Sequence, residues 1–228
     1  MTLKYLAIIP ARGGSKGILG KNLKEVNGKP LIAWSIEHAL SSPEVQHVIV
    51  STDNEEIAKI SKDYGAEVPF IRPINLAQDA TPTEPVLIHA LDFYEKQDYF
   101  FDAVILLQPT SPFRKQSTLS KAIKEFENSN SDSLLSVCEN HHFFWKNKAK
   151  PEALYDFQNR PRRQDISEFD RWYRENGSIY ITRVDILRKN NNRLGGKISM
   201  FVMTEEESWE VDSQADLKIA SALMSEVN

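Results

Sequence analysis

Short apolar runs that alternate with helical patterns are the feature that most constrains the fold of this chain. The runs consist mainly of Val, Ile and Leu and lie at residues 5–9, 48–50, 104–107 and 134–137. Such runs are typical of parallel strands that are covered on both faces. Between them, apolar residues recur three or four positions apart, as one face of a helix requires. The alternation predicts an α/β fold with a Rossmann-like, open, mostly parallel sheet flanked by helices.

The pattern breaks once and then resumes. Residues 139–175 fit neither a helix nor a buried strand; they contain the aromatic run 143–145 and the arginine-rich run 160–163. Strand patterns return at 179–181 and 201–203, and a helical pattern closes the chain. We therefore expect a single domain over residues 1–228, with an inserted segment at about 139–175. Exposed aromatic side chains in such a segment are typical of a protein interface.

A glycine-rich, cationic loop follows the first predicted strand. Residues 10–17 read Pro-Ala-Arg-Gly-Gly-Ser-Lys-Gly, and Gly-Lys-Asn follows at 20–22. Glycines let the backbone approach a ligand and point N–H groups at it, while Arg12, Lys16 and Lys21 supply positive charge. The loop lacks the spacing of a P-loop or of a dinucleotide fingerprint, which disfavours an NAD-dependent oxidoreductase. The sequence predicts a polyphosphate-binding loop of another kind.

Charge and composition exclude several other classes. The formal net charge of −4 gives no sign of bulk nucleic-acid binding. Apolar runs fall far short of the roughly 20 residues that span a bilayer, so we expect no membrane partner. The single cysteine, Cys138, excludes an intrachain disulfide and fits a reducing compartment. We expect a cytoplasmic protein.

Six blocks of sequence resemble the acylneuraminate cytidylyltransferases and occur in that family's order. They are the loop at 8–23, Arg-Pro at 72–73, Leu-Gln-Pro-Thr-Ser-Pro-Phe-Arg at 107–114, Arg-Arg-Gln at 162–164, Asn-Gly-Ser-Ile-Tyr at 176–180, and the acidic segment 211–216. The resemblance implies a nucleotide-diphospho-sugar transferase fold and an enzyme that couples CTP to a nine-carbon keto-sugar acid. It also implies a homodimer in which residues 139–175 are exchanged as a dimerisation segment.

The resemblance assigns the triphosphate to the glycine-rich loop. The nucleotide-binding residues it implies are Arg12, Gly13, Gly14, Ser15, Lys21, Asn22 and Arg72. Arg72 would read the cytosine base, although a loop arginine can also anchor its own turn. Lys21 is the candidate for stabilising charge at the α-phosphoryl group, because a flexible ammonium suits a phosphate oxygen. We name Lys21, Arg12 and Asp212 as the catalytic candidates.

Two carboxylates near the end of the chain are candidate metal ligands. In an extended strand, residues two apart point to the same side, so Glu210 and Asp212 can converge on one cation. Mg²⁺ typically takes one or two carboxylates together with phosphate oxygens and waters. Family members commonly carry Asp-x-Asp here, so the longer Glu210 is the less certain ligand and Asp212 the safer one. The sequence predicts an Mg²⁺ cofactor.

The sugar acid requires donors of its own. Gln108 follows a predicted strand, and the carboxyl ends of strands are where open α/β sheets gather ligands. Arg163 is the candidate partner of the sugar carboxylate, because a guanidinium forms two hydrogen bonds with a carboxylate. Asn176 and Tyr180 resemble further sugar contacts of the family. An arginine cluster such as 160–163 can also be a solvated or dimer-bridging face.

The expected reaction joins CTP to N-acetylneuraminic acid and gives the CMP-sugar and pyrophosphate. The alternative substrate is legionaminic acid or another bacterial nonulosonic acid. A reading of a different class is a nucleotide-binding protein of the same fold without activity. No side chain stands out as a general base, so we expect a metal, or a water held by Asp212, to remove the proton.

Overall fold

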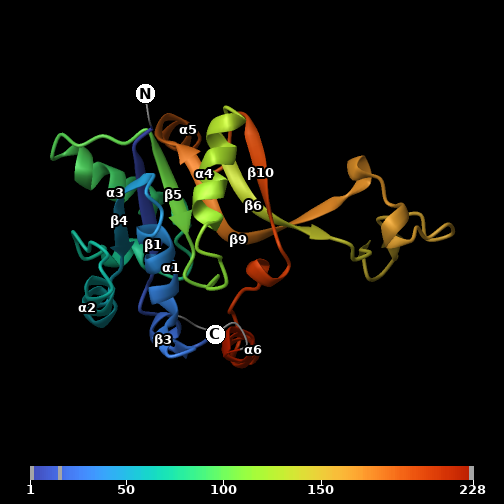
Figure 1. The fold of residues 1–228 in the computed structure, drawn as a ribbon, viewed down its shortest axis with the longest axis horizontal. Coiled ribbons are helices and arrows are strands. Elements are labelled where there is room, and N and C mark those ends of the chain that lie inside the picture. The colour runs from blue at the N-terminus through green and yellow to red at the C-terminus, as the bar shows by residue number, and fades with distance from the viewer. Residues whose placement is uncertain (1–2, 15–16, 226–228) are drawn as a thin grey trace.

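A six-stranded sheet forms the centre of the molecule (Figure 1), in a computed structural model that describes residues 3–14 and 17–225. Its strands, in spatial order, are β10 (Ile198–Met203), β6 (Ser133–Asn140), β9 (Trp172–Arg183), β5 (Ala103–Leu107), β1 (Tyr5–Pro10) and β4 (Val45–Ser51). All neighbouring pairs are parallel except those of β9, which runs antiparallel to β5 and β6. The predicted open, mostly parallel sheet is confirmed.

Helices cover both faces of this sheet. The elements α1 (Leu31–Leu40), α2 (Glu55–Asp63) and α4 (Thr118–Asn128) share one apolar cluster with Tyr5, Ala7 and Ile9 of β1. The opposite face of β1, with Leu6 and Ile8, packs against α3 (Thr83–Glu95) and α5 (Val184–Asn190). Successive residues of β1 therefore enter two different cores, which is why the strand is apolar at every position.

A third, smaller apolar cluster lies beside the sheet and joins the two halves of the chain. It contains Ile18 of the glycine-rich loop, Val26, Leu31, Val211 and Ala220. Ala220 belongs to the last helix, α6 (Gln214–Ser225), and Val26 to the hairpin of β2 (Glu25–Val26) and β3 (Lys29–Pro30). The packing brings the segment before α6 against the loop that follows β1.

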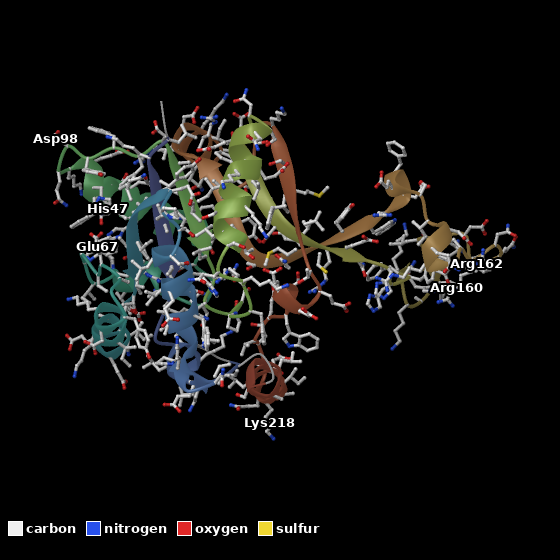
Figure 2. All side chains as sticks on the ribbon, in the orientation of Figure 1. His47, Glu67, Asp98, Arg160, Arg162 and Lys218 are labelled. Atoms are coloured by element: carbon white, nitrogen blue, oxygen red, sulfur yellow. The ribbon has the colours of Figure 1, made fainter. Side chains whose placement is uncertain are left out.

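The predicted insertion is an arm that projects from the sheet (Figure 1). It carries β7 (Trp145–Lys146), β8 (Glu152–Ala153) and the 3₁₀ turns η3 (Arg163–Asp165) and η4 (Glu168–Asp170). The predicted bounds of 139–175 need correction, because β6 and β9 extend into the base of the arm and pair as far as Asn140 with Trp172. The part outside these strands is 141–171, and Figure 2 shows Arg160 and Arg162 near its far end.

The order of the strands creates a switch point at β1. The crossover through α1 carries the chain to β4 on one side of β1, whereas β5 pairs on its other side. The loops after β1 and β5 therefore leave the same edge of the sheet in opposite directions, and a crevice opens there, as in other open α/β folds. Across the described residues, none of the helices has both the length and the apolar character needed to span a bilayer.

Candidate functional site

A cleft of about 480 Å³ lies at this switch point, a volume that suits a small-molecule ligand. It is bounded by the loop after β1, the segment before α3, the loop after β5 and the segment before α6. The predicted site residues that line it are Arg12, Lys21, Asn22, Arg72, Gln108 and Asp212. Four stretches of chain that are far apart in sequence thus meet at one cavity.

The glycine-rich loop holds its cations over the cleft by contacts with its own backbone and with acidic residues. The Asn22 amide donates to the carbonyl oxygen of Arg12 at 3.1 Å, and Arg12 forms an ion pair with Asp79. The N–H of Gly13 already donates to the Asp53 carboxylate at 2.9 Å, so it is not a free donor for phosphate. Gly14 has open space around its Cα. The predicted contact of Ser15 lies outside the described residues.

Lys21 and Asp212 meet across the cleft. The Lys21 Nζ lies 3.0 Å from Asp212 Oδ1; the lysine side chain is 16% exposed and the aspartate side chain 65% exposed. The approach is close in the backbone too, because a Cβ on Gly17 would lie 2.9 Å from the Asp212 carbonyl oxygen. Ile18 and Val211 enter the small cluster under α6 and fix this distance. The cationic loop and the carboxylate of Asp212 thus form one site.

Glu210 lies beside Asp212, but not in the strand that the sequence predicts. Residues 209–212 are outside the sheet, and the N–H of Val211 donates to the carbonyl of Thr110 at 2.8 Å. Val211 is buried, so its two acidic neighbours project away from the cluster. Burial raises the pKa of Glu210, and the nearby charge of Asp212 raises it further. The two carboxylates are close enough to influence each other, but the expected strand is absent.

Position 177 favours glycine because its backbone is left-handed, and the Glu210 carboxylate rests against the space that glycine leaves. A Cβ there would lie 2.6 Å from Glu210 Oε1 and 3.7 Å from Gln108 Nε2, and the backbone φ is +62°. The Glu210 carboxylate and the Gln108 amide therefore flank the same point of β9. This contact extends the site from the phosphate-binding loop to the carboxyl end of β5.

Arg72 lines the cleft, yet its guanidinium forms its hydrogen bonds within the protein. The side chain is buried; its Nε donates to Ser51 Oγ at 3.1 Å and its Nη2 to the Ser51 carbonyl. Burial lowers its pKa to about 10. These contacts are those of an arginine that anchors its own turn, the second of the two readings from the sequence.

The side chains of two predicted sugar contacts, Asn176 and Tyr180, are bonded within the protein and do not line the cleft. Asn176 is fully buried; its Oδ1 accepts from Ser136 Oγ at 2.6 Å and its Nδ2 donates to Ser208 Oγ at 2.8 Å. Tyr180 is buried in the core beneath α3, and its hydroxyl donates to Glu175. Within the Asn-Gly-Ser-Ile-Tyr block, Gly177 is the residue that lies against the site residues Glu210 and Gln108.

Arg163 does not join the other predicted residues. It lies in η3 on the arm and lines a second cavity of about 430 Å³, together with the aromatic side chains of Phe143, Phe144 and Trp172. The arm places this arginine away from the cleft of its own chain (Figure 2 labels its neighbour Arg162). Within one chain, the predicted sugar carboxylate partner is therefore missing from the site.

The sequence reasoning missed three residues that organise the cleft. Asp53 orients Gly13, Asp79 pairs with Arg12, and the buried Arg114 contacts the loop after β5. Asp53 follows directly after the end of β4, so the rule that selected Gln108 could also have found it. Arg114 carried no such signal, because it stands inside a proline-rich loop and its burial depends on the tertiary fold.

His38, on α1 behind Arg114, supports a prediction about acid stability. Burial lowers the pKa of His38 to about 3, and the charge of Arg114 lowers it too, partly offset by a backbone hydrogen bond with Arg114. An unfolded histidine has a pKa near 6.5, so the unfolded chain binds a proton that the folded chain refuses. The free energy of unfolding should then fall by about 1.4 kcal/mol per pH unit below about pH 6.5, until the pH approaches the folded pKa.

Urea unfolding at pH 6.5 and pH 5 measures this effect. We expect the wild-type protein to lose about 2 kcal/mol more than His38→Gln over this interval. His142→Gln is the control, because His142 is exposed on the arm, and it should keep the wild-type slope. An identical pH dependence in His38→Gln and the wild type would contradict the assignment.

Known proteins resemble this chain over most of its length. The sequence profile of a family described as cytidylyltransferase matches residues 6–207. The CMP-N,N'-diacetyllegionaminic acid synthase of Legionella pneumophila is 35% identical in an alignment of 231 positions that covers 97% of this chain and 97% of that protein. The N-acylneuraminate cytidylyltransferase of Escherichia coli is 32% identical in an alignment of 234 positions that covers all of this chain and 54% of that protein.

A solved structure shares the fold. The CMP:2-keto-3-deoxy-manno-octonic acid synthetase, solved in complex with CTP, superposes with a TM-score of 0.74 at 20% identity, over 99% of this chain and all of that one. At this identity the likeness concerns the fold alone. The match of the family profile over most of the length, together with relatives above 30% identity, decides the family. The chain belongs to the cytidylyltransferase family.

Proposed function

We propose that this enzyme transfers the CMP group of CTP to the anomeric hydroxyl of a nine-carbon 2-keto sugar acid, with a di-N-acylated legionaminic-type acid as its substrate. The observation that carries the proposal is the meeting of Lys21 and Asp212 in the cleft that also holds Arg12 and Gln108. A cationic loop, an acidic pair and an amide donor are the three elements that a nucleotidyl transfer between two anions needs.

The proposed sugar differs from the N-acetylneuraminic acid expected from the sequence. The legionaminic acid synthase of Legionella pneumophila aligns over 97% of both chains, whereas the E. coli N-acylneuraminate enzyme aligns over only 54% of its own length. These matches favour the alternative substrate over the first one. The two sugars differ in how many N-acyl groups they carry, so a substrate panel separates them.

In the proposed reaction, the anomeric hydroxyl oxygen attacks the α-phosphorus and pyrophosphate leaves. Lys21 and Arg12 neutralise the triphosphate, and they exchange their ion pairs with Asp212 and Asp79 for contacts with phosphate oxygens. Gln108 orients the sugar, because its amide both donates and accepts. Water at the exposed Asp212 carboxylate receives the hydroxyl proton.

The acidic pair fits a magnesium ion. Glu210 and Asp212 lie close enough for the charge of one to raise the pKa of the other, as do oxygen ligands gathered for a cation. Nowhere in residues 3–14 and 17–225 do three His, Cys, Asp or Glu side chains form a metal-binding group, which suits an ion that completes its shell with phosphate and water. When bound, Mg²⁺ would neutralise triphosphate charge and acidify the attacking hydroxyl.

A homodimer would supply the missing carboxylate partner. We infer that the arm of one subunit reaches the cleft of another and brings Arg163 to the sugar. The arm exposes large aromatic side chains, among them Phe157, Phe169 and Trp172, as interface residues do before assembly. Mixing Arg163→Ala with Lys21→Met subunits tests this inference. Shared sites restore about a quarter of the activity by random pairing, whereas independent sites restore none.

The activity itself is tested by release of pyrophosphate from CTP and Mg²⁺ with a panel of sugar acids. The panel contains di-N-acetyllegionaminic, N-acetylneuraminic, pseudaminic and octulosonic acids. We expect the highest kcat/KM with the legionaminic acid. Highest turnover of N-acetylneuraminic acid would restore the first reading, and calorimetric binding of CTP without any turnover would favour a non-catalytic protein.

The ion pair between Arg12 and Asp79 predicts a measurable effect on CTP binding. Because Asp79 competes with the triphosphate for Arg12, Asp79→Asn should bind CTP about two- to fivefold more tightly. Isothermal titration calorimetry without sugar measures the dissociation constant. Asp63→Asn, on the exposed side of α2, is the control and should bind as the wild type does. Weaker binding by Asp79→Asn would show that Asp79 supports the loop rather than competing for it.

A further inference from the structure

Arg114 is the most deeply buried charged side chain beside the cleft. It is 3% exposed and lies in the loop after β5. Its Nε donates to Ser178 Oγ at 2.8 Å, its Nη1 to Ser35 Oγ at 3.0 Å, and its Nη2 to the carbonyl oxygens of Gln108 and Ser178 at 2.6 and 3.1 Å. One guanidinium thus joins the end of β5, the strand β9 and the helix α1.

The positive charge of Arg114 has no acidic counterpart. All of the contacts above are with neutral oxygens, and no ion pair to it forms among residues 3–14 and 17–225. Burial lowers its pKa to about 9, and burial is the sole cause of the shift. Burying an unpaired cation destabilises a fold, and neutral side chains of similar volume avoid that cost. Stability of the fold alone does not account for an arginine here.

The carbonyl of Gln108 is the focus of these contacts. It accepts from Arg114 Nη2 at 2.6 Å, from Ser35 Oγ at 3.2 Å and from the N–H of Ser111 at 3.3 Å. Three donors on one carbonyl fix the orientation of the peptide at the end of β5. The side chain of the same residue lines the cleft. A fixed backbone therefore restricts where the Gln108 amide can point.

The contacts of Arg114 with Ser178 fix the part of β9 that the Gln108 amide faces. Ser178, which accepts two of its hydrogen bonds, follows Gly177, against which the Glu210 carboxylate and the Gln108 amide both rest. Arg114 thereby sets the spacing between the amide on β5 and the strand beneath Glu210. It touches neither the cleft nor a reacting atom.

We propose that Arg114 is a positioning residue that orients Gln108 for the sugar acid, and that its unpaired charge is retained because the ligand of this cleft is an anion. The proposal rests on the function proposed above. The buried cation lies behind Gln108, on the side of the cleft proposed for the sugar acid, and its charge reaches an anion there through the low dielectric of the core. Because Arg114 acts on the cleft through Gln108, we expect it to affect the sugar more than the nucleotide.

A double-mutant cycle tests the coupling. Gln108→Ala should raise the KM for the sugar acid about tenfold through the loss of its hydrogen bonds. Arg114→Lys keeps the charge but loses the planar set of guanidinium donors. It should raise the KM for the sugar acid about five- to tenfold and the KM for CTP less than twofold. Since both changes act through one amide, the double variant should be no worse than Gln108→Ala alone.

Milder and matched variants keep the test decisive if Arg114→Lys folds poorly. Ser35→Ala removes one acceptor of Arg114 and one donor to the Gln108 carbonyl. In the wild-type background it should raise the KM for the sugar acid about threefold. In the Gln108→Ala background it should leave that KM unchanged. Arg188→Lys, in a surface ion pair with Asp92 and Glu95, is the control for the exchange of arginine for lysine and should leave both KM values unchanged.

The outcomes separate this proposal from the proposed function. If the wild-type enzyme turns over no sugar acid of the panel, the proposed function fails. If the wild type turns over and the losses in the double variants multiply, Arg114 and Ser35 act independently of Gln108, and the positioning role is overturned. Equal rises in the KM for CTP and for the sugar would likewise indicate a purely structural role.

Discussion

We expect Lys21→Met to lower kcat about a thousandfold, the largest effect of any single change in this protein. The ammonium lies in the cleft 3.0 Å from Asp212, and methionine keeps an unbranched side chain one atom shorter, without the charge. Loss of one preorganised donor to a developing anionic charge typically costs two to three orders of magnitude. The fold should tolerate the change, since Asp212 is largely exposed and a partly exposed ion pair contributes at most about 1 kcal/mol.

Pyrophosphate release at saturating CTP and sugar measures this effect. Lys24→Met is the matched control, because Lys24 follows the same 3₁₀ turn but is exposed outside the cleft, and it should keep wild-type kcat. Thermal unfolding of both variants establishes that they are folded. A Lys21→Met enzyme that retained more than about a tenth of wild-type kcat would remove Lys21 from its catalytic role.

The second large effect is expected at Asp212. Asp212→Asn keeps the shape and the hydrogen-bonding oxygen but removes the negative charge, so we expect kcat to fall about a hundred- to a thousandfold and the Mg²⁺ concentration for half-maximal rate to rise. The loss should also change the pH–rate profile, because the carboxylate that holds the proton-accepting water is gone. The variant should bind CTP about as tightly as the wild type, since Lys21 becomes free for phosphate.

Titration of the rate with Mg²⁺ and with pH provides the test. Glu206→Gln, an exposed carboxylate in η5 four residues before Glu210, is the control and should match the wild type in both titrations. Turnover and pH dependence that survive the loss of the Asp212 carboxylate would count against its proposed role. An unchanged Mg²⁺ requirement with a lowered kcat would leave Asp212 as a proton acceptor but not as a metal ligand.

The layered sheet was predictable from the sequence because its signals are local. Buried parallel strands must be apolar at every position, so the run at 5–9 identifies β1 without any knowledge of its neighbours. The cationic loop is equally local, since its glycines and charges are adjacent in sequence. That Lys21 and Asp212 meet could be expected from the family resemblance, but the reason they meet, the packing of Ile18 against Val211 under α6, is tertiary.

The direction of individual side chains could not be predicted at irregular strands. Between Leu135 and Val137 of β6 the pairing with β9 shifts, and Asn176 and Gly177 lie at this bulge. A bulge breaks the alternation of faces, so a motif that identifies the segment does not say which of its residues faces the cleft. Asn176 consequently points into the core. Its neighbour Gly177, which has no side chain, lies against Glu210 and Gln108 of the site.

The surroundings of two further residues could not be predicted, because distant parts of the chain build them. The family resemblance places Arg163 among the sugar contacts, but the arm carries it to a second cavity, away from the cleft of its own chain. Arg114 is buried by Ser35 and Ser178, which lie 79 and 64 positions away along the chain. Neither environment leaves a periodic or compositional trace.

The small cluster beneath α6 has a consequence for how the enzyme matures. Ile18 leaves the ribosome long before its partners Val211 and Ala220. Domains fold as units once their contacts are available, so the β1 loop is fixed only after residue 220 has been made. We expect a nascent chain stalled before residue 209 to bind CTP poorly and to transfer no CMP, because Asp212 and the packing beside Lys21 are then absent.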